Sequence, residues 1–122
     1  MSIDREALLD LFNLIGEDPQ GLAELIESFL EQAPLLLDEM QRAAESGDNA
    51  VLCRAAHTLK STARDFGAKQ LSVLCETLEK LSRQGLPDHA AAQVDVISAT
   101  YILTERELGG CLADLKRGEW PG

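Results

Sequence analysis

His57 lies in a stretch with helical periodicity, on the side opposite the apolar residues. Those apolar residues recur at helical spacing and fall within about 60° of Leu59 on a helical wheel. They are Leu52, Ala55, Ala56, Leu59, Ala63 and Phe66. His57 lies about 160° from Leu59 on the same wheel, so its ring is expected to face solvent. A neutral imidazole is nucleophilic near pH 7 without help from a base, so an exposed ring can accept a phosphoryl group reversibly.

The side chains around His57 suit an approaching reactant. Helical side chains lean toward the N-terminus, so Lys60 leans back toward the imidazole, where its ammonium would stabilise a transferring phosphoryl group. Ser61 at i+4 and Cys53 at i−4 are both small and leave the ring open. Arg64 lies one turn further along and has a long reach. The spacing therefore predicts a phosphoacceptor histidine with cations beside it.

The sequence of residues 57–68 resembles the signature of the histidine-containing phosphotransfer (HPt) domain family of multistep phosphorelays. That signature is a histidine, any residue, leucine, lysine and glycine, then small or hydroxyl residues, and shortly afterwards a Gly-Ala pair. The matching residues are His57, Leu59, Lys60, Thr62, Ala63, Gly67 and Ala68. Ser61 stands where the family usually has glycine, and serine is also small. The resemblance extends over roughly residues 4–84.

The resemblance implies a role for His57 as a phosphocarrier. Its ring nitrogen, Nε2, would take the group from an aspartyl phosphate on a response-regulator receiver domain and hand it to another such aspartate. Lys60 would neutralise the bound phosphoryl group, while small and basic residues admit and steer an acidic partner surface. The residues expected on this docking face are Cys53, Ser61, Arg64 and Lys69. The implied partners are receiver domains and a hybrid sensor histidine kinase.

No cofactor is expected. Any Mg²⁺ would come from the acidic pocket of the receiver, because no cluster of carboxylates in this sequence is expected beside His57. A Gly-rich phosphate loop is also missing from the sequence, so we expect a carrier without kinase activity of its own.

Three other interpretations use the same residues. A metal site would have only Cys53 and His57 as ligands, since no neighbouring histidine or carboxylate completes a tetrahedral set. A hydrolase would use Ser61 or Thr62 with His57 as its base, but an orienting third group and an oxyanion hole are missing. The third is a scaffold or adaptor that binds receiver domains without chemistry. It stays open, because docking and transfer would use the same surface.

The charge of the chain is acidic overall but basic around the histidine. Its formal net charge of −10 would repel nucleic acid and anionic membrane surfaces, so neither is an expected partner. Residues 54–69 carry a net charge of +3 when the imidazole is neutral. The charged residues of this segment are Arg54, Lys60, Arg64 and Lys69, against Asp65. An acidic docking face or a phosphoryl group fits such a cluster.

The cysteines and the hydropathy pattern predict a reduced, cytoplasmic protein. Cys53, Cys75 and Cys111 are odd in number and lack C-x-x-C spacing, so neither a disulfide framework nor a zinc ribbon is indicated. No apolar stretch follows a basic start, and none reaches the roughly 18 residues of a membrane span. Met1 and the compact length favour a free-standing protein over a module of a larger kinase. A monomer is expected.

Leucine, alanine and charged residues dominate the composition, and the five aromatic residues are too few to favour a sheet. We expect one all-α domain over residues 1–122. Short connections predict an up-and-down antiparallel four-helix bundle with an additional short N-terminal helix. An irregular tail is expected over about residues 117–122, where Trp120 either packs back on the helices or belongs to a mobile end.

Local signals predict where the helices begin and end. Asp4 and the Asp18-Pro19 pair mark the starts of the first two helices, and Gly47 is expected to end the second. Pro34 is expected to kink the second helix without dividing it. Asp48 or Asn49 would begin the histidine helix, which ends near Phe66, followed by Gly67 at positive φ and Ala68.

Two further helices follow. The fourth is expected to pair antiparallel with the histidine helix, and its predicted buried face is Leu71, Leu74, Leu78 and Leu81. Glu76, Lys80 and Arg83 point away from this face. The last helix is long, with Val94, Ile97, Tyr101, Leu108 and Leu115 at helical spacing. Gly109 and Gly110 weaken its final turns by roughly 1 kcal/mol each relative to alanine.

Overall fold

The computed structural model describes residues 3–85 and 87–120. Over these residues the chain forms five α-helices and no strand. The helices are α1 (Arg5–Leu14), α2 (Pro19–Ser46), α3 (Asn49–Asp65), α4 (Lys69–Arg83) and α5 (Ala90–Lys116). The predicted all-α class is therefore confirmed.

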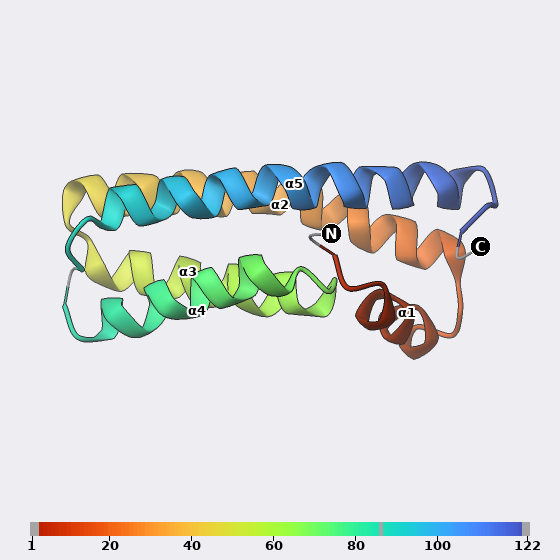
Figure 1. Cartoon of the computed structure of the whole chain (residues 1–122), viewed down its shortest axis with the longest axis horizontal. Helices are drawn as coiled ribbons and strands as arrows, with labels where there is room; N and C mark the ends of the chain where they lie inside the picture. Colours follow the sequence, from red (N-terminus) through yellow and green to blue (C-terminus); the bar gives the residue numbers. More distant parts are fainter. Residues whose placement is uncertain (1–2, 86, 121–122) are drawn as a thin grey trace.

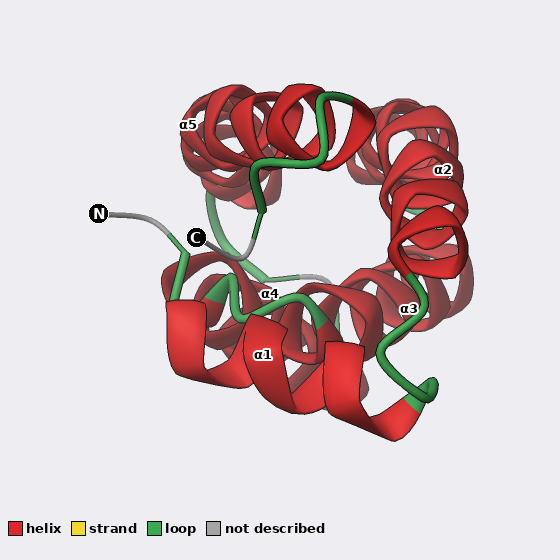
Figure 2. Ribbon diagram, turned by 90° about the vertical axis from the view of Figure 1, so that its right-hand side faces the viewer, coloured by secondary structure: helices red, strands yellow, loops and turns green. Residues whose placement is uncertain are grey.

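The four later helices run alternately in opposite directions, as the colours along the chain show in Figure 1. Helix α2 packs against α3 and α5, and α4 packs against the same two helices. Viewed along the long axis in Figure 2, the four helices surround a common core. Helix α3, which carries His57, therefore has α2 on one side and α4 on the other.

Helix α1 lies across one end of the shorter helices (Figure 2). At a rise of 1.5 Å per residue, α2 is about 42 Å long and α3 about 26 Å, so α2 extends well beyond α3. Helix α1 contacts both α2 and α3 at this end. Leu8 and Phe12 are its buried residues, so α1 covers apolar surface that α3 and α4 are too short to reach.

The predicted start and stop signals are in place. Asp4, Asp18 and Asp48 are the N-caps of α1, α2 and α3, and each side chain accepts a hydrogen bond from a backbone N–H in the first turn. Gly47 ends α2 in the left-handed conformation, with φ at +75°. Helix α2 continues through Pro34 as one helix. These local signals coincide with the starts of the first three helices and with the end of α2.

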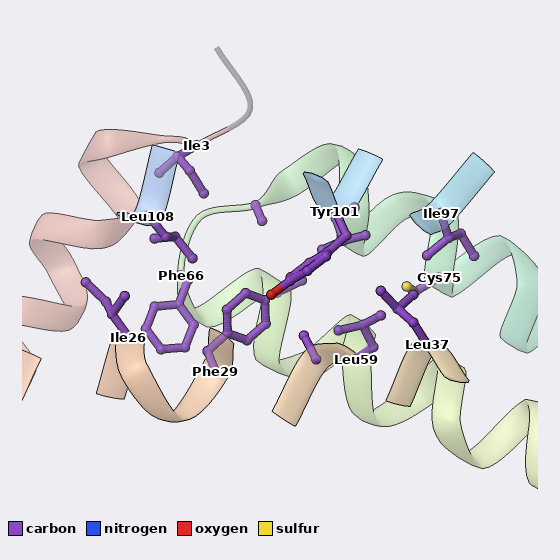
Figure 3. Close-up of a cluster of buried hydrophobic side chains, with 14 of the residues drawn as sticks. Ile3, Ile26, Phe29, Leu37, Leu59, Phe66, Cys75, Ile97, Tyr101 and Leu108 are labelled. Atoms are coloured by element: carbon purple, nitrogen blue, oxygen red, sulfur yellow. The ribbon is translucent and has the colours of Figure 1, made fainter. Parts of the chain in front are cut away.

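Aromatic side chains from three segments meet in the core. Phe29 of α2 lies with its ring centroid 5.0 Å from that of Phe66, which follows α3, and 6.0 Å from that of Tyr101 on α5. Figure 3 shows these rings beside Ile26 and Leu108. The predicted apolar face of α5 is buried throughout: Val94, Ile97, Tyr101, Leu108 and Leu115. The end of α3 is thus anchored to α2 and α5.

The C-terminal segment packs back on the fold. Helix α5 continues through Gly109 and Gly110, where its flanking Leu108 and Cys111 are buried. Trp120 is also buried and meets the ring of Phe12 edge-on, with 5.2 Å between centroids. The alternative in which Trp120 packs on the helices is therefore correct. Residues 121 and 122, the rest of the predicted tail, lie outside the described residues.

The buried face of α4 differs from the prediction. Leu71 and Leu78 are buried as expected, but Leu74 is only half-buried and Leu81 is 38% exposed. The residues that α4 buries are Leu71, Ser72, Cys75, Leu78, Glu79 and Ser82. Helix α4 is thus rotated from the leucine stripe toward a face that includes polar side chains, and one of these is a carboxylate.

Candidate functional site

Helix α3 presents His57 to solvent. The predicted core residues of α3 are all buried: Leu52, Ala55, Ala56, Leu59 and Ala63. The side chain of His57 lies on the other side of the helix and is 55% exposed. The predicted exposure of the imidazole is therefore confirmed, and the periodicity of the apolar residues explains it.

A carboxylate from α4 holds the ring. His57 Nδ1 lies 2.6 Å from Oε2 of Glu79, whose side chain is only 2% exposed. An ionised carboxylate can only accept hydrogen bonds, so Nδ1 carries the proton and donates it. In the neutral ring this leaves the lone pair on Nε2. The pair thus selects the tautomer whose other nitrogen is nucleophilic.

Glu79 is ionised because three cationic or donating side chains surround it. Lys60 Nζ lies 2.7 Å from Oε1, and Arg83 Nη2 lies 2.7 Å from Oε2. Burial by itself would raise the pKa of Glu79, but the hydrogen bonds and positive charge of Lys60 and the hydrogen bond from His57 outweigh burial and lower this pKa. The carboxylate therefore stays charged at neutral pH.

Glu79 is absent from the site residues that the sequence predicted. The expectation concerned a cluster of carboxylates beside His57, whereas the structure places a single carboxylate against the ring. Glu79 follows Leu78 directly, and a glutamate on an amphipathic helix is normally solvated. Its burial became possible because α3 supplies the donors, from residues 19 and 22 positions earlier in the chain. A helical wheel of α4 alone contains no such signal.

Lys60 also differs from the prediction. Its spacing predicted that Lys60 leans toward His57 with its charge available to a phosphoryl group, but its side chain is 15% exposed and is bound to Glu79. The ammonium does lie near the imidazole, since both are hydrogen-bonded to the same carboxylate. Its charge is balanced by Glu79, so it is not the free cation that the spacing suggested.

Ser61 and Cys53 flank His57 one turn to either side. Both are half-buried. The thiol of Cys53 donates a long hydrogen bond of 3.7 Å to the backbone oxygen of Glu79. Both side chains are small, as the spacing analysis noted, so neither has the length to cover the exposed ring.

The predicted basic cluster is partly neutralised. Lys69 Nζ lies 2.7 Å from Oδ2 of Asp4, and the hydrogen bond and charge of Lys69 lower the pKa of that carboxyl. Arg54 lies 4.0 Å from Glu39 of α2. Arg64 is exposed and forms no ion pair with any residue that the structure describes. The positive charge available to a partner is therefore smaller than the sequence implied.

The Gly67-Ala68 pair joins the two helices that build the site. Gly67 has φ of +78°, and its carbonyl accepts a hydrogen bond of 2.7 Å from the backbone N–H of Asp4. A Cβ atom on this glycine would lie 2.5 Å from the backbone oxygen of Asp4. Ala68 is fully buried and precedes α4 directly. The tight turn sets α4 against α3, which brings Glu79 to His57.

The described part of the chain contains neither a metal site nor a membrane-spanning helix. Within residues 3–85 and 87–120, no three or more histidine, cysteine, aspartate or glutamate side chains gather in a way that could hold a metal ion. Across the same described residues, no helix combines the length and apolar character needed to cross a bilayer.

Comparisons with known proteins agree with this geometry. No curated protein matches the chain. Among solved structures, the chain is similar to histidine-containing phosphotransfer protein B (HptB) from Pseudomonas aeruginosa PAO1, with a TM-score of 0.83 and 21% identity. The similarity covers 95% of this chain and 96% of that protein, and at such identity it shows a shared fold. The family model of the Hpt domain matches residues 24–118, which include His57, its cationic neighbours and Glu79. By this match over most of its length, the chain belongs to the Hpt domain family.

Proposed function

We propose that the protein is a histidine phosphotransfer protein of a two-component multistep phosphorelay. In this role His57 carries a phosphoryl group between the aspartates of receiver domains. The observation that supports this most directly is the 2.6 Å contact between His57 Nδ1 and Glu79, because it leaves Nε2 of an exposed ring as the nucleophile. Membership of the Hpt domain family supports the same role.

The transfer step can be written from these atoms. The lone pair of Nε2 attacks the phosphorus of a receiver's aspartyl phosphate, an N–P bond forms, and the P–O bond breaks to release the aspartate as a carboxylate. The proton stays on Nδ1, so the phosphorylated ring gains positive charge, which the Glu79 carboxylate at 2.6 Å stabilises. The reverse step passes the group to the aspartate of a second receiver.

Lys60 is proposed to stabilise the phosphoryl group from its place on Oε1 of Glu79. Small side chains would admit the partner and exposed cations would steer its acidic face. The proposed docking residues are Cys53, Ser61, Arg64 and Lys69. Any Mg²⁺ would be bound in the acidic pocket of the receiver.

We further infer a monomeric cytoplasmic carrier without kinase activity, served by a hybrid sensor histidine kinase and by receiver domains. The net charge of −10 argues against nucleic acid and anionic membranes as partners. The alternating directions of α2 to α5 and the crosswise α1 support an up-and-down four-helix bundle with one added helix (Figures 1 and 2).

A phosphotransfer assay tests the proposal. The protein is mixed with receiver domains carrying a ³²P-labelled aspartyl phosphate, and an acid-labile, alkali-stable label is expected on the wild type. His57→Gln should abolish this label. His89→Gln is the matched control, because His89 is the other histidine and is also exposed, and it should keep full labelling. A wild-type protein that binds receivers without becoming labelled would instead be a scaffold, and a label that survives in H57Q would refute His57 as the acceptor.

A further inference from the structure

One oxygen of the buried carboxylate has two donors. Oε2 of Glu79 lies 2.6 Å from His57 Nδ1 and 2.7 Å from Arg83 Nη2, whereas Oε1 has only Lys60, also at 2.7 Å. Arg83 is on α4, one turn after Glu79, and its side chain is 60% exposed. The guanidinium therefore lies on the solvent side of the carboxylate, beside the edge of the imidazole that carries the proton.

This contact is unlike an ordinary ion pair between neighbouring turns. On the same helix, Lys80 and Glu76 have the same i, i+4 spacing at 3.4 Å, with side chains 66% and 46% exposed. Such solvated ion pairs contribute little to the free energy of folding. Glu79 is 2% exposed and hydrogen-bonded to the ring of His57. The charge of a cation bound to this carboxylate is therefore poorly screened by solvent and acts on the imidazole.

The charges around Glu79 show the direction of the effect. His57 and Lys60 face it from α3, and Arg83 and the thiol of Cys75 adjoin it from α4. Burial, with the charge of Glu79, raises the pKa of Cys75 to about 12, so this thiol is neutral. With a neutral imidazole and a neutral thiol, the side chains around and including Glu79 have a net charge of +1, from Lys60, Arg83 and Glu79.

Arg83 changes the net charge that these side chains have after a phosphoryl group is added to His57. Phosphorylation adds one net negative charge, because the phosphoryl group on Nε2 is a dianion while the ring that keeps its Nδ1 proton becomes positive. The net charge therefore goes from +1 to zero, whereas without the guanidinium it would go from zero to −1. Arg83 therefore favours the anionic phosphoryl group on Nε2.

We propose that Arg83 is a positioning residue of the phosphoacceptor site, which shares Oε2 of Glu79 with His57 and so fixes the carboxylate and balances the negative charge of the phosphoryl group on the ring. This inference rests on the proposed function of His57. Among the residues that the structure describes, Glu79 is the hydrogen-bond and ion-pair partner of Arg83, so Arg83 acts through this carboxylate.

The rate of phosphoryl acceptance tests the proposal with three variants. Arg83→Gln should accept label from a phosphorylated receiver roughly two- to fivefold more slowly, in keeping with one partly exposed charge. Arg83→Lys keeps the charge and should recover most of the rate. Lys80→Gln removes a cation of similar exposure that does not contact Glu79, and it should match the wild type. Equal rates in R83Q and the wild type, or equal slowing in K80Q, would overturn the inference.

A measurement on the ring itself separates this inference from the proposed function. In protein labelled with ¹⁵N-histidine, the Nδ1–H of His57 should give a resolved signal that exchanges slowly with water. R83Q should speed that exchange at least twofold, R83K should restore it, and K80Q should leave it unchanged. Urea unfolding confirms that each variant is folded. If no receiver labels the wild type but R83Q still alters the signal, the positioning role stands and the phosphorelay proposal fails. If labelling is normal and neither readout responds to R83Q, the role of Arg83 is refuted.

Discussion

His57 Nδ1 and Glu79 Oε2 lie 2.6 Å apart, although the two residues are 22 positions apart in the chain and differ sharply in exposure. One is a surface side chain and the other is an interior carboxylate. The contact means that the orientation of an exposed ring is set by a group that cannot move freely. An imidazole held in this way presents one defined nitrogen to an incoming partner.

Replacing Glu79 with glutamine tests the charge of this pair. The amide oxygen can still accept from Nδ1, but it cannot stabilise positive charge on the phosphorylated ring, so transfer should slow roughly tenfold, about 1.4 kcal/mol. Lys60 loses its counter-charge, and unfolding free energy should fall by about 1–3 kcal/mol. Labelling kinetics and urea unfolding measure the two effects. Glu76→Gln on the same helix is the exposed control, and unchanged transfer in E79Q would contradict the role assigned to the carboxylate.

Replacing Lys60 with alanine tests its proposed action on the phosphoryl group. Transfer should slow by roughly fivefold, about 1 kcal/mol, because one nearby positive charge is lost, while His57 can still be labelled. Stopped labelling reactions at several times give the rate and the end point. Lys80→Ala is the control, since Lys80 binds Glu76 and not Glu79. A wild-type rate in K60A would remove this lysine from the mechanism.

The pH dependence of stability should reveal Glu79. Burial raises the pKa of Glu79, but the hydrogen bonds from Lys60 and His57 lower this pKa by more than burial raises it. The pKa in the folded state therefore lies below the usual 4.5. A carboxyl whose pKa is lower in the folded state stabilises the fold above its unfolded pKa and loses this contribution as the pH falls through the folded value. Unfolding free energy of the wild type should therefore decline below about pH 4.5. The unfolding free energy of E79Q, measured in urea, should decline less over the same pH range. If the two proteins lost stability in parallel as the pH falls, Glu79 would not be the cause of the decline.

Replacing Gly67 with alanine should destabilise the turn between α3 and α4. Gly67 has φ of +78°, and the new Cβ would lie 2.5 Å from the backbone oxygen of Asp4. Gly16 is the matched control, with φ of +80° and nothing within 4 Å of its added Cβ. Gly16→Ala should cost about 1–2 kcal/mol from backbone strain alone, and G67A should cost clearly more. Equal losses in thermal or urea unfolding would show that the close approach to Asp4 is not tight.

Replacing Trp120 with alanine should test whether the C-terminal segment belongs to the folded core. Trp120 is 6% exposed and packs edge-on against Phe12, so its removal should cost about 3 kcal/mol. Because the chain has one tryptophan, its emission reports the same contact and should shift to the red on unfolding. Two results would mean that this side chain does not pack in solution. One is an unfolding free energy unchanged in W120A, and the other is wild-type emission typical of a solvent-exposed indole.

The helices and the exposure of His57 follow from local sequence. An aspartate cap, a glycine at positive φ and apolar residues at helical spacing act within one or two turns, so Asp18, Gly47 and Leu59 are informative without the rest of the chain. The histidine motif is equally local, since all its members lie on α3 and the turn that follows. These features could be predicted for that reason.

The partners of the charged residues were decided by tertiary structure. The rotation of α4 depends on packing against both α3 and α5, and it buries Glu79 while leaving Leu81 partly exposed. A carboxylate is stable there only because Lys60 and His57 approach it from another helix. Sequence alone thus determined that the imidazole of His57 is exposed. The packing of α3 against α4 decided what holds it, because burying a charge depends on donors that lie far away along the chain.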